Sequence, residues 1–161
     1  MFNAAKLKFD DIFENRLSEE EVREYLLELY ERGETSAEIA GAASAMRDHL
    51  IPLPIHEDLK AKAIDVVGTG GDKSYSFNIS STVSILLAAC GCYVAKHGNR
   101  SVTSKSGSAD MLEVLGINLN LDLESTAKML EETGFAFMFA NNHHPAMKYI
   151  TPVRKTIPHR T

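Results

Sequence analysis

The fold is decided by residues 63–72, which read AIDVVGTGGD. A short apolar run followed directly by glycines indicates a strand that ends in a tight turn. Residues 92–104 read CYVAKHGNRSVTS and repeat this arrangement, with cationic and hydroxyl side chains in the second turn. Glycines let backbone N–H groups approach an anion closely, and hydroxyl, Lys and Arg groups complete its shell. The two loops together predict one site for a ligand with more than one phosphate.

The composition excludes several classes of protein. The chain has 161 residues, a hydrophobic fraction of 44% and a net charge of −5. This length suits one domain, or one domain with a small appendage, and the acidic balance argues against general attraction to nucleic acid or to membranes. No run approaches the length of a membrane span, and residues 1–6 lack an apolar signal core, so we expect a cytoplasmic protein. Cys90 and Cys92 are expected to be reduced packing residues.

Residues 1–62 are expected to form a helical domain and a connector. Ser18 and Glu21 have the spacing of a capping box, and Thr35 and Glu38 repeat it. Apolar residues at helical spacing follow each box, and the second helix is rich in alanine, which leaves room for close approach of another helix.

Residues 63–161 alternate strand-like and helical segments, which is typical of a parallel α/β sheet. We expect strands at 63–67, 92–95 and 135–140, and helices at 78–91, 106–115, 122–134 and 144–150. Ligands of such sheets bind outside the carboxyl ends of the strands, where both Gly-rich loops fall. Three parallel strands leave exposed edges. We therefore expect that another chain completes the sheet, or that the sequence is the front half of a longer protein.

The start of the helix at 78–91 strengthens the prediction of a phosphate site. Residues 76–82 read SFNISST and hold five hydroxyl or amide side chains, whereas one helix cap needs only one. A helix N-terminus is also a natural seat for phosphate. The glycines at 68–71 are a weak signal alone, because they fit neither the dinucleotide fingerprint nor a Walker A loop. A turn without a ligand, and a solvated basic loop at 96–100, are the alternatives.

Two histidines and an arginine near the end of the chain are less specific. His143 and His144 precede Pro145, but no third ligand is spaced to complete a metal site, so capping or packing is the simpler interpretation. Either Arg154 or His144 could face a carboxylate substrate. On spacing alone, an ordinary surface position is the simpler interpretation of Arg154.

In combination, these motifs resemble the N-terminal half of the anthranilate phosphoribosyltransferase family. The motifs are GTGGD at 68–72, FNIS at 77–80, KHGNRSV at 96–102, SKSGSAD at 104–110, HPAMK at 144–148 and VRK at 153–155. The resemblance implies a small helical domain and a large α/β domain of the nucleoside phosphorylase and phosphoribosyltransferase class, in a homodimer joined through the helical domains. It also implies transfer of the phosphoribosyl group from phosphoribosyl pyrophosphate to the amine of anthranilate, with Mg²⁺ and with release of pyrophosphate, in tryptophan biosynthesis.

The resemblance also implies the residues of the site. Phosphoribosyl pyrophosphate would be bound by Gly68, Gly71, Asp72, Ser76, Asn78, Ser80, Ser81, Lys96, His97, Gly98, Asn99, Arg100, Ser101, Val102, Thr103, Ser104 and Ser108. Anthranilate would be bound by Gly68, His97, Asn99, His144 and Arg154, and Ser80 would contact a magnesium ion. No residue is assigned as a catalytic acid or base, and Lys96, Asn99 and Arg154 are expected to act by positioning.

The sequence departs from the family at a few positions. Ser76 and Ser81 stand where the family usually has Thr, and Lys73 stands where many relatives have Gly. The family's acidic pair that holds magnesium would lie beyond residue 161, so we expect little activity from this chain alone. A pyrimidine-nucleoside phosphorylase, a nucleic-acid-binding relative of the same fold and a purely structural piece are the alternatives. The KHGNR run disfavours the first, and the acidic balance with the intact first loop disfavours the second.

Overall fold

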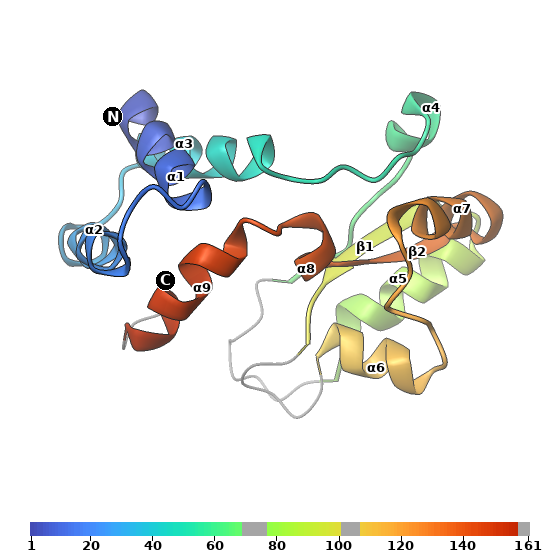
Figure 1. Ribbon diagram of the computed structural model, residues 1–161. Helices are drawn as coiled ribbons and strands as arrows, with labels where there is room; N and C mark the ends of the chain where they lie inside the picture. The colour runs from blue at the N-terminus through green and yellow to red at the C-terminus, as the bar shows by residue number, and fades with distance from the viewer. Residues whose placement is uncertain (69–76, 101–106, 158–161) are drawn as a thin grey trace. The chain divides into compact units, whose positions relative to one another are not determined.

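The computed structural model describes residues 1–68, 77–100 and 107–157, and the chain folds into two compact units (Figure 1). One unit contains residues 1–51 together with the segment from His144 onward, and the other contains residues 52–143. The contacts thus divide the chain differently from the sequence-based boundary after residue 62, because the last helix packs with the N-terminal helices.

The helical unit contains four helices, and local signals set the starts of two of them. Its helices are α1 (Phe2–Phe13), α2 (Glu19–Arg32), α3 (Ser36–Asp48) and α9 (Met147–Thr156). Both expected capping boxes are present: the hydroxyls of Ser18 and Thr35 each accept the N–H three residues on, at 3.3 Å. The Glu21 and Glu38 carboxylates accept the N–H groups of the two caps at 2.8 Å and 3.0 Å. A buried cluster joins the four helices: Ile12, Phe13, Val22, Leu26, Ala45, Ile150, Val153 and Ile157.

The close packing of α1 and α3 depends on Gly41. A Cβ atom on Gly41 would lie 2.5 Å from the carbonyl oxygen of Phe2 and 2.9 Å from the backbone nitrogen of Lys6. Ala45, one turn further along α3, is fully buried, whereas Ala40 is exposed. The alanine-rich segment therefore permits the expected close approach, but the residue at the point of contact is a glycine.

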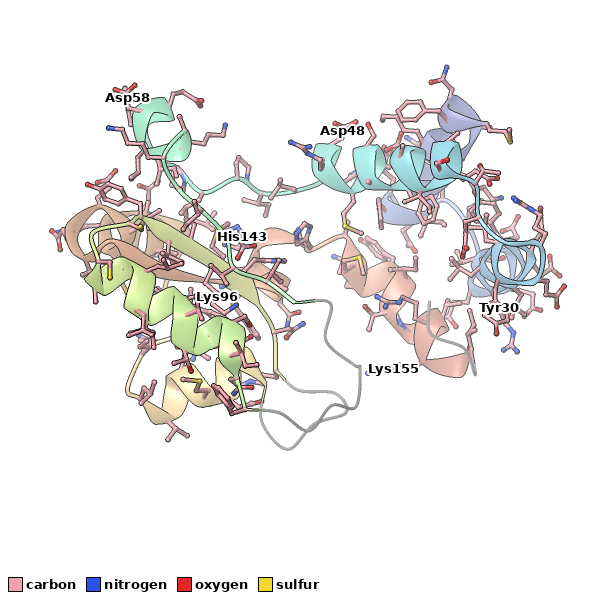
Figure 2. The ribbon with its side chains drawn as sticks, turned by 180° about the vertical axis from the view of Figure 1, so that it is seen from behind. Tyr30, Asp48, Asp58, Lys96, His143 and Lys155 are labelled. Carbon is pink, nitrogen blue, oxygen red and sulfur yellow. The ribbon has the colours of Figure 1, made fainter. Side chains whose placement is uncertain are left out.

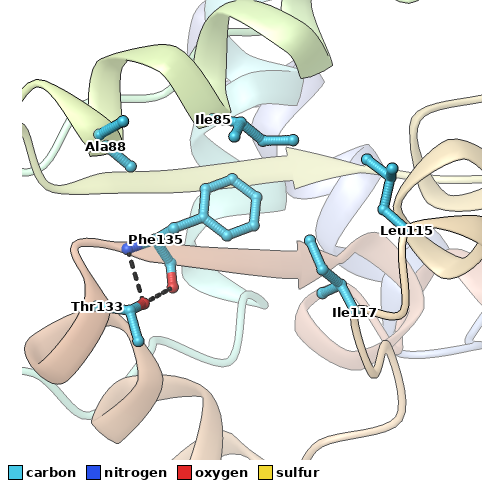
Figure 3. A pocket seen from close by; sticks show the side chains of 7 residues that line it. Ile85, Ala88, Leu115, Ile117, Thr133 and Phe135 are labelled. Atoms are coloured by element: carbon cyan, nitrogen blue, oxygen red, sulfur yellow. Dashed lines mark hydrogen bonds between the residues drawn. The ribbon is translucent and has the colours of Figure 1, made fainter.

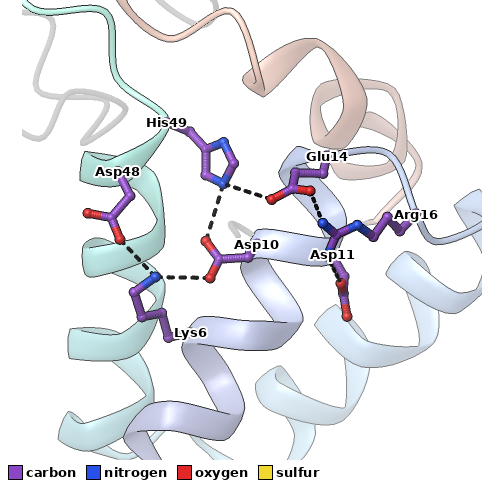
Figure 4. Close-up of polar contacts among 7 residues, drawn as sticks. All are labelled: Lys6, Asp10, Asp11, Glu14, Arg16, Asp48 and His49. Atoms are coloured by element: carbon purple, nitrogen blue, oxygen red, sulfur yellow. Dashed lines mark hydrogen bonds and ion pairs between the residues drawn. The ribbon is translucent and has the colours of Figure 1, made fainter.

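A polar network lies along the edge of the α1–α3 contact (Figure 4). The Lys6 ammonium group joins Asp10 of its own helix at 2.9 Å and Asp48 of α3 at 2.7 Å. The His49 ring lies 3.2 Å from Asp10 and 3.9 Å from Glu14. Hydrogen bonding to Asp48, and then to Asp10, raises the pKa of Lys6 above its usual value. These pairs are half-buried at the surface, where ion pairs contribute modestly to stability, so close packing around Gly41 is the stronger constraint.

The α/β unit contains a parallel sheet, as expected. Strand β1 (Val94–Gly98) pairs in parallel with β2 (Phe135–Phe139), with Val94 opposite Phe135. On the other side of β1, Ile64 forms a single parallel bridge to Val94. The expected strand at 63–67 is therefore reduced to one bridged residue, and β1 starts and ends later than expected.

The helices of this unit cover the sheet. They are α4 (Glu57–Lys60), α5 (Ile79–Ala89), α6 (Ser108–Val114), α7 (Leu123–Thr133) and α8 (Ala140–His143). Helix α5 packs on both strands and on α6, whereas α7 and α8 pack on β2. The buried residues between them are Val94, Ala109, Leu112, Leu119, Phe135 and Phe137. Within the described residues, no helix has the length and apolar character that a membrane crossing requires.

Local signals predict the boundaries of α7 but not those of α9. The Asp122 carboxylate accepts the N–H of Ser125 at 2.7 Å, and Gly134 ends α7 in the left-handed conformation, with φ of 73°. Pro145 was expected to start the last helix, but α9 begins at Met147 and Pro145 lies in the preceding turn.

We predict that Gly41→Ala lowers the free energy of unfolding of the helical unit by about 1–3 kcal/mol, because the added methyl group meets backbone atoms of α1 that cannot move aside. Urea unfolding followed by circular dichroism measures this change. Ala40→Leu, an exposed substitution on the same helix, is the matched control and should change stability by less than about 0.5 kcal/mol. Equal stability of the Gly41 variant and the original protein would show that the helices do not pack at this point.

Candidate functional site

Lys96 is a buried cation in the middle of β1, two residues before the strand ends at Gly98. Only 1% of the residue's surface is exposed (Figure 2). Strand alternation puts its side chain on the same face of β1 as that of the buried Val94. The ammonium group donates a hydrogen bond to the carbonyl oxygen of Val66 at 2.7 Å. Burial lowers the pKa of Lys96, and the negative charge of Asp65 offsets a smaller part of this effect by raising it. A buried charge is costly unless it is paired and hydrogen-bonded, so this arrangement points to a use beyond packing.

The start of α5 offers hydroxyl groups beside a helix N-terminus. Ser81 has 1% of its surface exposed, and its hydroxyl has no hydrogen-bond partner within the described part of the chain. The Ser84 hydroxyl, in contrast, donates to the carbonyl oxygen of Ser80 at 2.7 Å. The first turn of a helix also presents N–H groups that no intrahelical carbonyl accepts. An anion placed here would meet both kinds of donor.

Two asparagines connect α5, the end of β1 and the start of α6. The side-chain amide of Asn78, the N-cap position of α5, donates to the carbonyl oxygen of Gly107 at 3.2 Å. The carbonyl oxygen of Asn99, just after β1, accepts the Ser108 hydroxyl at 3.2 Å and the N–H of Ala109 at 3.3 Å. Three segments that are distant in the sequence therefore meet at one end of the sheet.

Gly98 allows this close meeting. A Cβ atom on Gly98 would lie 2.3 Å from the hydroxyl oxygen of Ser108 and 2.8 Å from a ring carbon of Phe137. Only a glycine fits between α6 and the aromatic ring of β2 without moving one of them. This sets the direction in which the chain leaves β1 toward Asn99 and Arg100.

Arg100 is already paired with carboxylates of α6. Its guanidinium group contacts both oxygens of Glu113, at 2.8 Å and 3.0 Å, and one oxygen of Asp110 at 3.3 Å. Hydrogen bonding to Glu113 raises the pKa of Arg100, and the same contact lowers the pKa of Glu113. An anionic ligand that uses Arg100 must share it with these acids or displace them.

The other expected site residues fall into three groups. Gly68 and His97 are described and belong to the α/β unit. His144 and the exposed Arg154 belong to the helical unit, so their expected contact with anthranilate stays a prediction. The remaining expected residues lie outside the described part of the chain: Gly71, Asp72, Ser76, Ser101, Val102, Thr103 and Ser104.

Sequence reasoning missed Asp65. Its carboxylate accepts the backbone N–H of His97 at 3.1 Å and acts on the charge of Lys96. The sequence does contain a signal for this residue, because Asp65 is the one carboxylate in the otherwise apolar run at 63–67, three residues before Gly68. Without the pairing of Ile64 with β1, the sequence gives no reason to connect it with Lys96.

An apolar hollow of about 410 Å³ in the same unit does not suit a phosphorylated ligand (Figure 3). Its walls include Ile85, Leu115, Ile117 and Phe135. The one hydroxyl there, that of Thr133, already bonds to backbone groups of Met129 and Phe135. The described residues also contain no cluster of three or more His, Cys, Asp or Glu side chains that could hold a metal ion.

The model of the glycosyl transferase family, a/b domain, matches residues 60–161, and the helical bundle domain of the same family matches residues 3–50. The chain therefore belongs to this glycosyl transferase family. It is similar to anthranilate phosphoribosyltransferase from Lactococcus lactis subsp. lactis, strain IL1403, with 48% identity over 155 residues. That match covers 96% of this chain and 45% of the relative, so the chain spans about half the length of the curated relatives it matches.

Solved structures agree with this assignment. The crystal structure of anthranilate phosphoribosyltransferase from Thermus thermophilus matches with a TM-score of 0.91 and 39% identity, over 100% of this chain and 48% of that one. The Saccharomyces cerevisiae enzyme, in complex with phosphoribosyl pyrophosphate (PRPP) and Mg, matches with a TM-score of 0.78 and 26% identity, over 99% of this chain and 47% of that one. The expected fold class, a helical domain with a parallel α/β domain, is thereby confirmed.

We predict that Gly98→Ala lowers the free energy of unfolding of the α/β unit by about 1–3 kcal/mol, because the methyl group would overlap Ser108 and Phe137. Urea unfolding measures the change. The second substitution Ser108→Ala, made in the Gly98→Ala background, removes the nearer obstacle and should recover part of the loss. If Gly98→Ala is neutral, the end of β1 does not pack against α6 as described.

Proposed function

We propose that this chain supplies the phosphoribosyl pyrophosphate site of an enzyme that transfers the phosphoribosyl group to the amine of anthranilate. The observation that carries the proposal is the meeting of the starts of α5 and α6 with the end of β1, the strand that holds the buried cation Lys96. The similarity to anthranilate phosphoribosyltransferases over nearly the whole chain supports the choice of substrates. A cytoplasmic location and a homodimer formed through the helical domain belong to the same proposal.

In this proposal the residues bind and position the donor. Displacement at the anomeric carbon of the sugar places negative charge on the departing pyrophosphate, which cationic and N–H donors stabilise. The Lys96 ammonium group has three N–H bonds, of which the carbonyl oxygen of Val66 accepts one. The Ser81 hydroxyl and the first-turn N–H groups of α5 supply further donors.

Magnesium fits this site as a companion of the diphosphate. Mg²⁺ is usually held by one or two protein oxygens and by substrate phosphates, and it neutralises charge on the leaving group. The described residues offer the Ser80 hydroxyl, at the start of α5, and no acidic cluster. Ser80 is therefore proposed as a ligand alongside phosphate oxygens.

Anthranilate is the proposed acceptor. Its aromatic amine is already a nucleophile, so positioning outweighs base catalysis. Arg154 has the planar, two-pronged geometry that suits a carboxylate, and Gly68, His97, Asn99 and His144 are proposed to line the path of the acceptor. The relatives reported above favour this acceptor over the nucleic-acid-binding and nucleoside phosphorylase alternatives.

Titration calorimetry with PRPP and Mg²⁺ tests the proposal. We expect the chain to bind this ligand, and Lys96→Met to weaken the affinity by at least about tenfold, because a hydrogen bond from a charged donor is lost. Lys60→Met, an exposed change on α4, is the control and should leave the affinity unchanged. Equal affinities in the Lys96 variant and the original chain, or no binding by the original chain, would contradict the proposed site.

A further inference from the structure

The backbone between Ile64 and Gly68 leaves the sheet in an unusual way. The N–H of Ile64 donates to the carbonyl oxygen of Tyr93 at 2.9 Å, and the N–H of Ala95 donates to the carbonyl oxygen of Ile64 at 3.0 Å. A parallel ladder would continue with a bond from the N–H of His97 to the carbonyl oxygen of Val66. The structure has no such bond, although both groups lie in its described part, because each is bonded to a side chain instead.

Two side chains take the place of that ladder bond. The Asp65 carboxylate accepts the N–H of His97 at 3.1 Å, and the Lys96 ammonium group donates to the carbonyl oxygen of Val66 at 2.7 Å. Both backbone groups and both side chains therefore stay hydrogen-bonded, although the backbone after Ile64 no longer pairs with β1. The separation comes directly before Gly68, at the carboxyl end of the sheet where the proposed ligand binds.

We propose that Asp65 is a positioning residue of this site, holding the two strand ends apart and keeping the Lys96 side chain cationic for phosphoribosyl pyrophosphate. The inference rests on the proposed function for the identity of the ligand. Asp65 is not a catalytic residue, because it acts through Lys96 and through the backbone of His97.

Within the part of the chain that the structure describes, few charges lie around Lys96, which makes Asp65 important. Burial lowers the pKa of Lys96, and among the described residues the negative charge of Asp65 raises it. The elements packed on β1, which are α5 and β2, contain no titratable side chain, and α8 on β2 contributes the buried His143. Removing the charge of Asp65 should therefore lower the pKa of Lys96 further, so that Lys96 loses its proton at a lower pH.

The Asp65→Asn variant separates the charge from the hydrogen bond. It keeps an oxygen that accepts the N–H of His97 and removes only the charge. We expect its affinity for PRPP and Mg²⁺ to be close to that of the original chain near neutral pH. As the pH rises through the lowered pKa of Lys96, the variant should lose affinity before the original chain does, by up to about tenfold for each unit by which the two pKa values differ.

The Asp65→Ala variant removes both the charge and the acceptor. The N–H of His97 and the carbonyl oxygen of Val66 then become available to each other, and the ladder can extend toward Gly68. We expect weaker binding at every pH, and a changed amide resonance of His97 in the NMR spectrum. Asp58→Asn, an exposed change on α4 of the same unit, is the matched control and should alter neither property (Figure 2).

A ligand-free titration keeps this test apart from that of the proposed function. The Lys96 pKa is measured from its side-chain carbon resonances as pH rises, in the original chain and in Asp65→Asn. A lower pKa in the variant supports the inference, and an unchanged pKa overturns it, whether or not the ligand binds. A loss of affinity in Asp65→Asn that is the same at every pH would also overturn it, because that pattern indicates a structural role alone.

Discussion

The buried ammonium group of Lys96 is the constraint on which the α/β unit depends. Taking a lysine charge out of water costs several kcal/mol unless polar groups compensate it. This cost is comparable to the whole free energy of unfolding of a typical domain. Here the compensation comes from the carbonyl oxygen of Val66 and the charge of Asp65, both on the segment that bridges to β1. That segment must therefore stay against β1 for Lys96 to remain buried and charged. The geometry before Gly68 follows from this requirement.

The same requirement explains why one end of the sheet is polar. The other contacts there are hydrogen bonds to backbone groups, made by Asn78 and Ser108, and a close approach that only Gly98 allows. These contacts fix the backbone positions of the segments that the proposed site requires. The helical unit is built differently. Helices α2 and α3 begin at capping boxes, and apolar packing holds the four helices together, with ion pairs at half-buried and exposed positions.

Local signals in the sequence predict much of the fold. The capping boxes at Ser18 and Thr35, the cap at Asp122 and the stop at Gly134 are all present, because each depends on residues within one turn of chain. The alternation of apolar and helical segments likewise predicts the parallel sheet. The family resemblance adds the class of ligand, which spacing alone does not determine.

Features that depend on contacts between distant parts of the sequence could not be predicted. Residues 63–67 have the composition of a strand, yet only Ile64 bridges to β1, because Asp65 and Lys96 take the next ladder groups. The role of Asp65 is hidden for the same reason, since its partners lie about thirty residues away in the sequence.

A crystal structure of this chain with PRPP and Mg²⁺ would show whether Lys96 and the start of α5 hold the diphosphate. We predict that the diphosphate lies within hydrogen-bonding distance of the Lys96 ammonium group and of the first turn of α5, with the contact between Asp65 and the N–H of His97 retained. A diphosphate bound away from the end of β1, with Lys96 still bonded only to Val66, would contradict it.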